Sequence, residues 1–195
     1  MHNRPTGRTC LLGLLAVTLL AGCAASTSLT LTPSPQPALC QRSTQRINAV
    51  VLWGTKWRVD QKDVADREVA ASNGIARFFR ESGCFAGVEV RRLASSTEPR
   101  EQAAVVANLS KNDVVLVVLV RELGPILKLG SSAALIEGGT EVVLEISAYE
   151  PRATTPARAF SVHWQNGGPG VVKGVASLPA DIASALAASL QPEPK

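Results

Sequence analysis

Two short runs of apolar residues most constrain the fold of this chain. After one leading polar residue, positions 48–53 and 113–120 are occupied only by alanine, valine, leucine and tryptophan. Strands with this pattern are covered on both faces, as in a parallel sheet flanked by helices. Residues 88–93, which lie between them, alternate with charged side chains, as is typical of an edge strand. We therefore expect the first half of the sheet to be parallel.

Helical patterns separate and follow these strands. Residues 61–82 place apolar side chains on one helical face and charged side chains on the other, and a glycine follows them. Two more helices are predicted over residues 98–109 and 179–190, the last from apolar residues spaced four apart. The first part of the chain thus has the order βαβαβ.

The pattern changes after residue 120. Residues 141–149 and 159–165 alternate between apolar and polar positions, which predicts two antiparallel strands with one wet face. Residues 124–139 form either an extra strand or a partly apolar flap. Since 195 residues suit one core, we expect one mixed α/β domain over residues 40–191: βαβαβ, an antiparallel hairpin and a C-terminal helix, with a short tail at 192–195.

The N-terminal segment has the composition of a secretory signal. Arg4 and Arg8 precede an apolar run at 11–20, and small residues follow it. The run is shorter than the roughly 20 residues that a transmembrane helix needs, so residues 1–22 are expected to be cleaved. Their removal lowers the net charge from +4 to 4 − 2 = +2. Because no run of five basic residues exists, nucleic acid is not expected as a partner.

The residues Leu20-Ala21-Gly22-Cys23 resemble the lipobox of bacterial lipoproteins. This resemblance implies cleavage before Cys23 and a diacylglycerol on its thiol, and two or three acyl chains make such attachment effectively permanent. It also implies the outer membrane, with the domain on the periplasmic face, because Ala24 replaces the aspartate that retains such proteins on the inner membrane. The alternative is an ordinary cleaved signal that leaves Cys23 as a free or disulfide-bonded thiol.

The segment after the signal is rich in serine, threonine and proline. Residues 23–39 are therefore predicted to be the lipidated cysteine followed by a flexible tether. Cys40 and Cys84 then remain as an even pair in an oxidising compartment, which predicts a disulfide, with two buried thiols as the alternative. A structural zinc is not expected, because two distant cysteines and one mature histidine do not supply four ligands.

The chain lacks the common catalytic motifs. It contains no phosphate-binding loop with Gly-Lys-Ser/Thr, no His-Glu-x-x-His and no Gly-x-Ser-x-Gly. His163 falls on the wet face of its strand and has no nucleophile nearby in sequence, so we interpret it as a surface residue. Asp63, Asp66 and Glu68 lie beside basic residues on one helix, where ion pairs explain them. We expect neither an enzyme nor a cofactor.

Binding loops in parallel sheets lie at the carboxyl ends of the strands. Trp57 and Arg58 follow the first predicted strand, and Arg121 follows the third. Tryptophan and arginine contribute most to interface energetics, so these three residues are the candidate contact surface for a partner. The alternative is that Trp57 only covers the first helix.

The order of elements is similar to that of small periplasmic α/β domains of envelope accessory lipoproteins, such as the N-terminal domain of the translocation protein TolB or the curli secretion lipoprotein. The likeness concerns element order only and transfers no site residues. It implies a non-enzymatic accessory or assembly factor that binds a protein partner of an envelope complex. The alternative is a binder of an envelope small molecule or glycan, such as a peptidoglycan fragment or a lipid.

Overall fold

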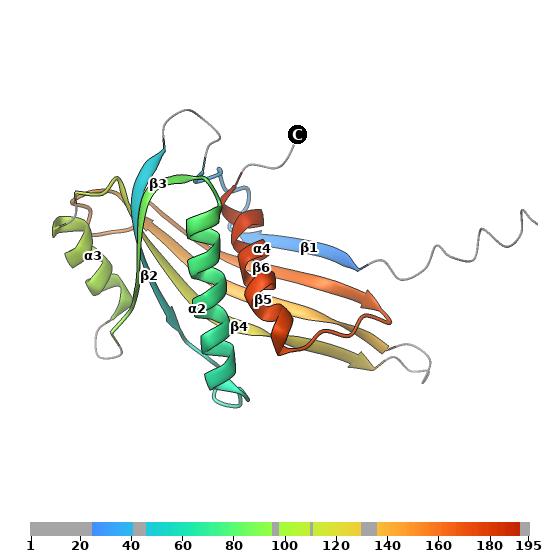
Figure 1. The fold of residues 1–195 in the computed structure, drawn as a ribbon. Coiled ribbons are helices and arrows are strands. Elements are labelled where there is room, and N and C mark those ends of the chain that lie inside the picture. Colours follow the sequence, from blue (N-terminus) through green and yellow to red (C-terminus); the bar gives the residue numbers. More distant parts are fainter. Residues whose placement is uncertain (1–24, 41–45, 95–97, 110, 130–135, 192–195) are drawn as a thin grey trace, which may run out of the picture.

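The computed structural model describes residues 25–40, 46–94, 98–109, 111–129 and 136–191. Within them, six strands form one mixed sheet in the order β1-β6-β5-β4-β2-β3, accompanied by α-helices, as the predicted α/β class requires (Figure 1). The elements are β1 (Ser26–Thr32), β2 (Ile47–Thr55), α2 (Val64–Glu81), β3 (Phe85–Arg92), α3 (Pro99–Leu109), β4 (Val114–Leu129), β5 (Ile136–Tyr149), β6 (Arg158–Pro169), the 3₁₀ turn η2 (Val175–Ser177) and α4 (Leu178–Leu190).

The parallel half of the sheet has the predicted arrangement. β2 lies between β3 and β4 and pairs with both in parallel, and β3 is an edge strand. The side chains of β2 are buried on both faces, because Val51 and Trp53 belong to one apolar cluster and Val50 and Leu52 to another. A continuous apolar run is the pattern that such a doubly covered strand needs.

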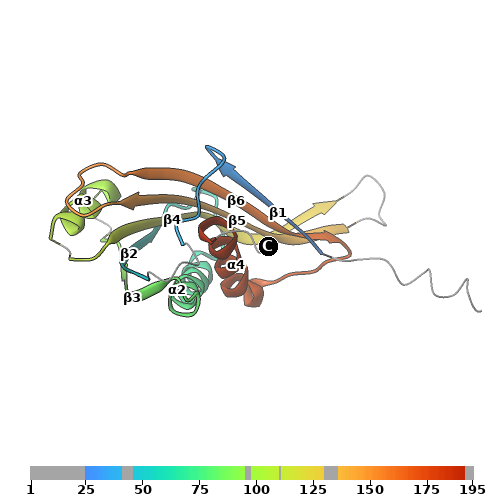
Figure 2. The same ribbon diagram turned by 90° about the horizontal axis from the view of Figure 1, so that it is seen from above.

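Helices cover the two faces of the sheet unequally. α2 and α4 lie side by side on one face, where they enclose the main core between themselves and the sheet (Figure 2). They approach so closely at Gly74 that a Cβ there would lie 2.1 Å from Ile182 Cγ2. On the other face, α3 buries Ala103 and Ala107 against β2 and β4. The face of β5 and β6 beyond α3 is therefore open, and Ser161 and His163 of β6 are exposed there.

The predicted flexible tether is wrong for residues 26–32. These residues form β1, which pairs antiparallel with β6 from Ser26 opposite Gly167 to Thr32 opposite Ser161. The segment alternates in sequence, and Leu31 packs against the main core. Composition alone indicated a linker, because prolines and serines surround this short alternating stretch. Its pairing partner, the free edge of β6, lies 129 or more positions away and is not visible locally.

Residues 124–139 form neither an extra strand nor a flap in the part that the structure describes. They extend β4 and β5 into a long hairpin whose pairs continue to Leu129 opposite Ile136. A β-bulge interrupts the register between Val120 and Glu122. The pairing of β2 with β4 ends at Thr55 opposite Val120, so the far part of β4 has no strand beside it on that edge.

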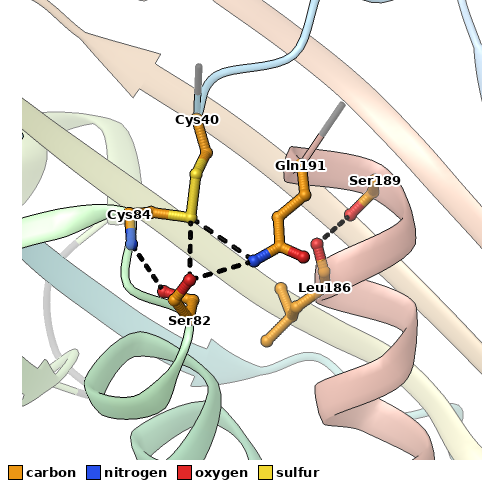
Figure 3. The surroundings of a disulfide bond; sticks show 6 residues. All are labelled: Cys40, Ser82, Cys84, Leu186, Ser189 and Gln191. Atoms are coloured by element: carbon orange, nitrogen blue, oxygen red, sulfur yellow. Dashed lines mark hydrogen bonds between the residues drawn. A yellow bond between two sulfur atoms is a disulfide. The ribbon is translucent and has the colours of Figure 1, made fainter. Parts of the chain in front are cut away.

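The predicted disulfide between Cys40 and Cys84 is present (Figure 3). Their Cα atoms lie 5.4 Å apart. The backbone N–H of Cys40 donates to the carbonyl of Leu190 at 2.9 Å, and Gln191 Nε2 donates to the carbonyl of Ser82 at 3.3 Å. The disulfide therefore joins the segment after β1 to the end of α2, and the hydrogen bond to Leu190 joins the same segment to the end of α4.

No helix in the described ranges is both long and apolar enough to cross a membrane. The predicted signal at 1–22, the lipidation site Cys23 and the tail at 192–195 lie outside these ranges. They stay predictions from the sequence.

Candidate functional site

The loop between β2 and α2 carries two of the three residues predicted to bind a partner. We call residues 56–63 the Trp57 loop. Trp57 is half-buried and packs against the main core, whereas Arg58 is 67% exposed. Val59, next along the chain, is fully exposed. The loop thus combines an anchored tryptophan with an exposed cation and an exposed apolar side chain.

Ion pairs hold this loop against β4. Arg58 Nε lies 3.3 Å from Glu122 Oε2, and Arg67 Nη1 lies 3.7 Å from Glu122 Oε1. Arg67 also donates to the carbonyl of Lys62 at 2.8 Å and to the carbonyl of Leu123. Because Glu122 and Arg67 are mostly buried, these contacts are less screened by water than surface pairs are. Arg67 also occupies the edge of β4 that β2 leaves free.

A second ionic cluster lies beside the loop, at the carboxyl end of β3. Arg92 Nη2 lies 2.6 Å from Glu68 Oε2 and its guanidinium lies 5.2 Å from the centre of the Trp53 ring. Glu68 Oε1 accepts a hydrogen bond of 2.9 Å from Thr55 Oγ1. The ion pairs expected for Glu68 within its own helix are thus replaced by a pair with β3, because the sheet brings Arg92 closer.

These contacts change the acidity of Glu68. Its pKa lies below the ordinary value, chiefly because Arg92 donates a hydrogen bond to the carboxylate. Partial burial opposes this effect, and the hydrogen bond from Thr55 adds to it. The buried indole Nε1 of Trp57 also contributes to lowering the pKa, although it makes no hydrogen bond of ordinary geometry. The cluster therefore keeps Glu68 ionised beside the Trp57 loop.

Replacing Arg92 with alanine is expected to raise the pKa of Glu68. A carboxyl whose folded-state pKa is depressed stabilises the fold above its unfolded pKa, and this contribution is lost as the pH falls through the folded pKa. The wild type should therefore be more stable than Arg92→Ala at neutral pH, and the difference should shrink in acid to what the contact between Arg92 and Trp53 contributes. NMR titration of the Glu68 carboxyl checks the shift. Arg91→Ala is the matched control, because Arg91 pairs with Glu89 instead, at 2.6 Å.

Arg121, the third predicted contact residue, lies in a separate ion pair. It occupies the β-bulge of β4, and its Nη1 lies 3.2 Å from Glu145 Oε1 on β5. Its neighbour Glu122 pairs instead with Arg58. The structure therefore brings Trp57 and Arg58 together and gives Arg121 a different partner. The bulge at Arg121 separates the ion pairs of Arg121 and Glu122, and sequence reasoning does not reveal this bulge.

His163 is exposed, as predicted. Its Nε2 lies 2.5 Å from Glu141 Oε1, which also accepts a hydrogen bond of 3.0 Å from Gln165 Nε2. The three side chains belong to the open face of β5 and β6. Among the described residues, no group of three or more histidines, cysteines or carboxylates is placed to hold a metal ion.

A cavity of about 220 Å³ lies where β1, β5 and β6 meet at the hairpin end of the sheet. Its lining is uncharged: Ser26, Ser28, Ile126, Gly138, Gly139, Thr140, Gln165, Asn166, Gly167, Gly168 and Pro169. The hydroxyl of Thr140 is buried and has no hydrogen-bond partner among the residues that the structure describes. Sequence reasoning missed this site, because it treated Ser26 and Ser28 as tether.

No family model matches the chain, and no curated protein matches it in sequence. Among solved structures, a PelC variant from Paraburkholderia phytofirmans, solved as a dodecamer, is 18% identical with a TM-score of 0.46, over 84% of this chain and 98% of that chain. The protein XCC0632 from Xanthomonas campestris is 13% identical with a TM-score of 0.40, over 81% and 86%. The lipoprotein GNA1162 from Neisseria meningitidis is 13% identical with a TM-score of 0.36, over 72% and 99%. Likenesses of this size assign the chain to no family.

Proposed function

We propose that this chain is a lipid-anchored lipoprotein of the bacterial outer membrane. Its periplasmic domain binds a protein partner of an envelope complex as a non-enzymatic accessory or assembly factor. The lipobox ending at Cys23 supports the anchor. The observation that carries the binding role is the fully exposed Val59 on the Trp57 loop, which ion pairs from Arg58 and Arg67 hold in place.

The loop has the physical properties of a binding surface. An exposed apolar side chain gains free energy when a partner removes it from water, and a neighbouring arginine supplies hydrogen-bond donors at the rim. A loop that is already held in place loses little conformational freedom on binding, so less of the interaction energy is lost. Trp57, packed on the main core, anchors the loop from beneath.

Photo-crosslinking from Val59 tests this proposal. A photoreactive amino acid at position 59 of the acylated protein, irradiated in cells, is expected to give a discrete protein adduct. The adduct should be lost when Arg58→Glu is added, because the reversed charge repels Glu122 and releases the loop. Leu109, which is 81% exposed at the end of α3, is the control position. Equal adducts from positions 59 and 109, or none from 59, would contradict the proposal.

A second candidate function, the binding of a small envelope molecule or glycan, is favoured by the cavity at the hairpin end. Its uncharged hydroxyl, amide and backbone groups and the unpartnered Thr140 Oγ1 suit a neutral polyhydroxyl ligand. Binding of peptidoglycan fragments that shifts the NMR signals of Gln165 and Asn166, without an adduct from Val59, would favour this function over the first.

A further inference from the structure

We propose that the hairpin end of the sheet rests against the headgroup layer of the membrane that holds the lipid anchor. We define this hairpin end by four described residues: Ser26 at the start of β1, Gly138 near the start of β5, and Gly167 and Pro169 among the last residues of β6. The inference deepens the proposed function, since it rests on acylation of Cys23. In this arrangement the domain is held at the bilayer in one orientation and does not move on a long tether.

The length of free chain carries the argument. Only two residues, Ala24 and Ala25, lie between Cys23 and Ser26, and the three steps along the chain from Cys23 to Ser26 span at most about 11 Å when fully extended. The tether predicted from composition, which continues to residue 39, would reach about 55 Å. Because Ser26 is already paired with Gly167, the chain available between lipid and domain is only the shorter one.

β1 is held at both ends, so its residues do not add to the length of free chain between the lipid and the domain. At its start, Ser26 Oγ donates to the carbonyl of Gly167 at 3.2 Å and Asn166 Nδ2 donates to Thr27 Oγ1 at 2.7 Å. Beyond its end, the disulfide of Cys40 fixes the chain to the opposite end of the helical layer. Peeling β1 from β6 would break seven residue pairs, which makes a tethered state unfavourable.

The chemistry of the hairpin end suits a headgroup layer. β5 and β6 meet there through glycines: a Cβ on Gly167 would lie 2.6 Å from the Cα of Gly139. The cavity at this end is lined by hydroxyl, amide and backbone groups and no charged side chain. The polar groups of such a cavity can hydrogen-bond to phosphate and glycerol oxygens of the headgroups. The small side chains at the hairpin end also allow this end of the sheet to approach the headgroup layer closely.

The orientation also sets the distance of the Trp57 loop from the membrane. β2 ends at Thr55, whose row across the sheet passes through Val120 and Leu144 to Val162. Val162 precedes Gly167 by five residues, which is about 17 Å along a strand. A partner of the Trp57 loop would therefore itself lie close to the membrane. The loop between β5 and β6, at the other end of the 12-residue β6, lies about 40 Å from the hairpin end.

Fluorescence quenching at the two ends of β6 tests the orientation. A dye is attached to Pro169→Cys or, as the matched far-end control, to Thr154→Cys, both exposed positions. The full acylated protein is placed in phosphatidylethanolamine and phosphatidylglycerol vesicles that carry a nitroxide on the headgroup. Quenching of the dye at position 169 is expected to exceed that at 154 several-fold. Position 169 lies far from Cys23 in sequence, so only the fold of the domain can bring a dye at this position to the membrane surface.

A linker variant separates orientation from mere anchoring. A flexible glycine-serine insert of about 12 residues between Ala24 and Ala25 restores a tether, so quenching at position 169 is expected to fall to the level at 154. Mass spectrometry of Cys23 accompanies every sample. Acylated protein with equal quenching at both positions overturns this inference alone. Protein with an unmodified Cys23 overturns the proposed anchor, and this inference with it.

Discussion

Replacing Cys40 and Cys84 together with serine is expected to lower the free energy of unfolding by about 4 kcal/mol. The disulfide closes a loop with a sequence separation of 44, and chain-entropy estimates for a loop of that length give this magnitude. The native contacts around it, such as the hydrogen bond from Gln191 to Ser82, do not depend on the covalent bond. Most of the loss should therefore arise from the greater freedom of the unfolded chain.

The loss should also be local to β1. Without the disulfide, β1 keeps its pairing with β6 and the packing of Leu31 but loses its covalent link to the end of α2, so its amide protons are expected to exchange faster than those of β2. Urea denaturation and hydrogen exchange, both in a Cys23→Ser background, measure the two effects. Ser82→Ala is the control, because it removes only a hydrogen bond of 3.4 Å to the Cys84 N–H. A loss below 1 kcal/mol in the double serine variant would contradict the entropic argument.

Replacing Lys173 with methionine is expected to lower the free energy of unfolding by about 3 kcal/mol. Lys173 Nζ lies 2.7 Å from Asp181 Oδ1, and Asp181 is 6% exposed. The other carboxylate oxygen, Oδ2, is buried and has no hydrogen-bond partner in the described part of the chain. Removing Lys173 leaves an uncompensated buried charge, the usual cause of a loss of this size. It also removes the ammonium that lies 5.8 Å from the centre of the Trp164 ring.

A double-mutant cycle separates the ion pair from packing. Lys173→Met combined with Asp181→Asn should recover part of the stability that Lys173→Met loses, because no charge is then buried. Arg77→Met is the control, since Arg77 and Glu81 form an exposed pair worth about 0.5 kcal/mol or less. Urea midpoints of the wild type, Lys173→Met, Asp181→Asn, the double variant and Arg77→Met give the comparison. Equal losses for Lys173→Met and Arg77→Met would show that burial does not strengthen the interaction.

Much of the fold follows from patterns within a few residues of each other. The apolar run before Trp53, the alternating charges of β3 and the helical spacing in α2 each depend on near neighbours, and the structure confirms all three elements. The same reasoning failed for β1. Its apolar alternation is limited to Leu29 and Leu31, and the neighbouring prolines and serines masked it.

The candidate site was predictable to a smaller extent. Trp57 and Arg58 lie in the loop after β2, as predicted, because loops after parallel strands have a known position in such folds. Their contact with a partner stays a prediction. Their ionic partner Glu122 depends on the bulge at Arg121, and a bulge moves one side chain without a clear sequence signal. The pair of Glu68 with Arg92 likewise depends on β3 lying beside the start of α2.

Local sequence is sufficient to predict the signal and lipobox, the types of most elements and the pairing of Cys40 with Cys84, because each prediction rests on a motif, a period or a count. The three-dimensional packing alone decided that β1 completes the sheet, that the long hairpin extends β4 and β5, and that Ser26 and Thr140 share a cavity. For β1 and the cavity, the physical reason is that they bring together segments more than 100 residues apart in sequence. In the hairpin of β4 and β5 the paired residues lie much nearer in sequence, but there too the pairing is made by backbone groups, which carry no sequence signature.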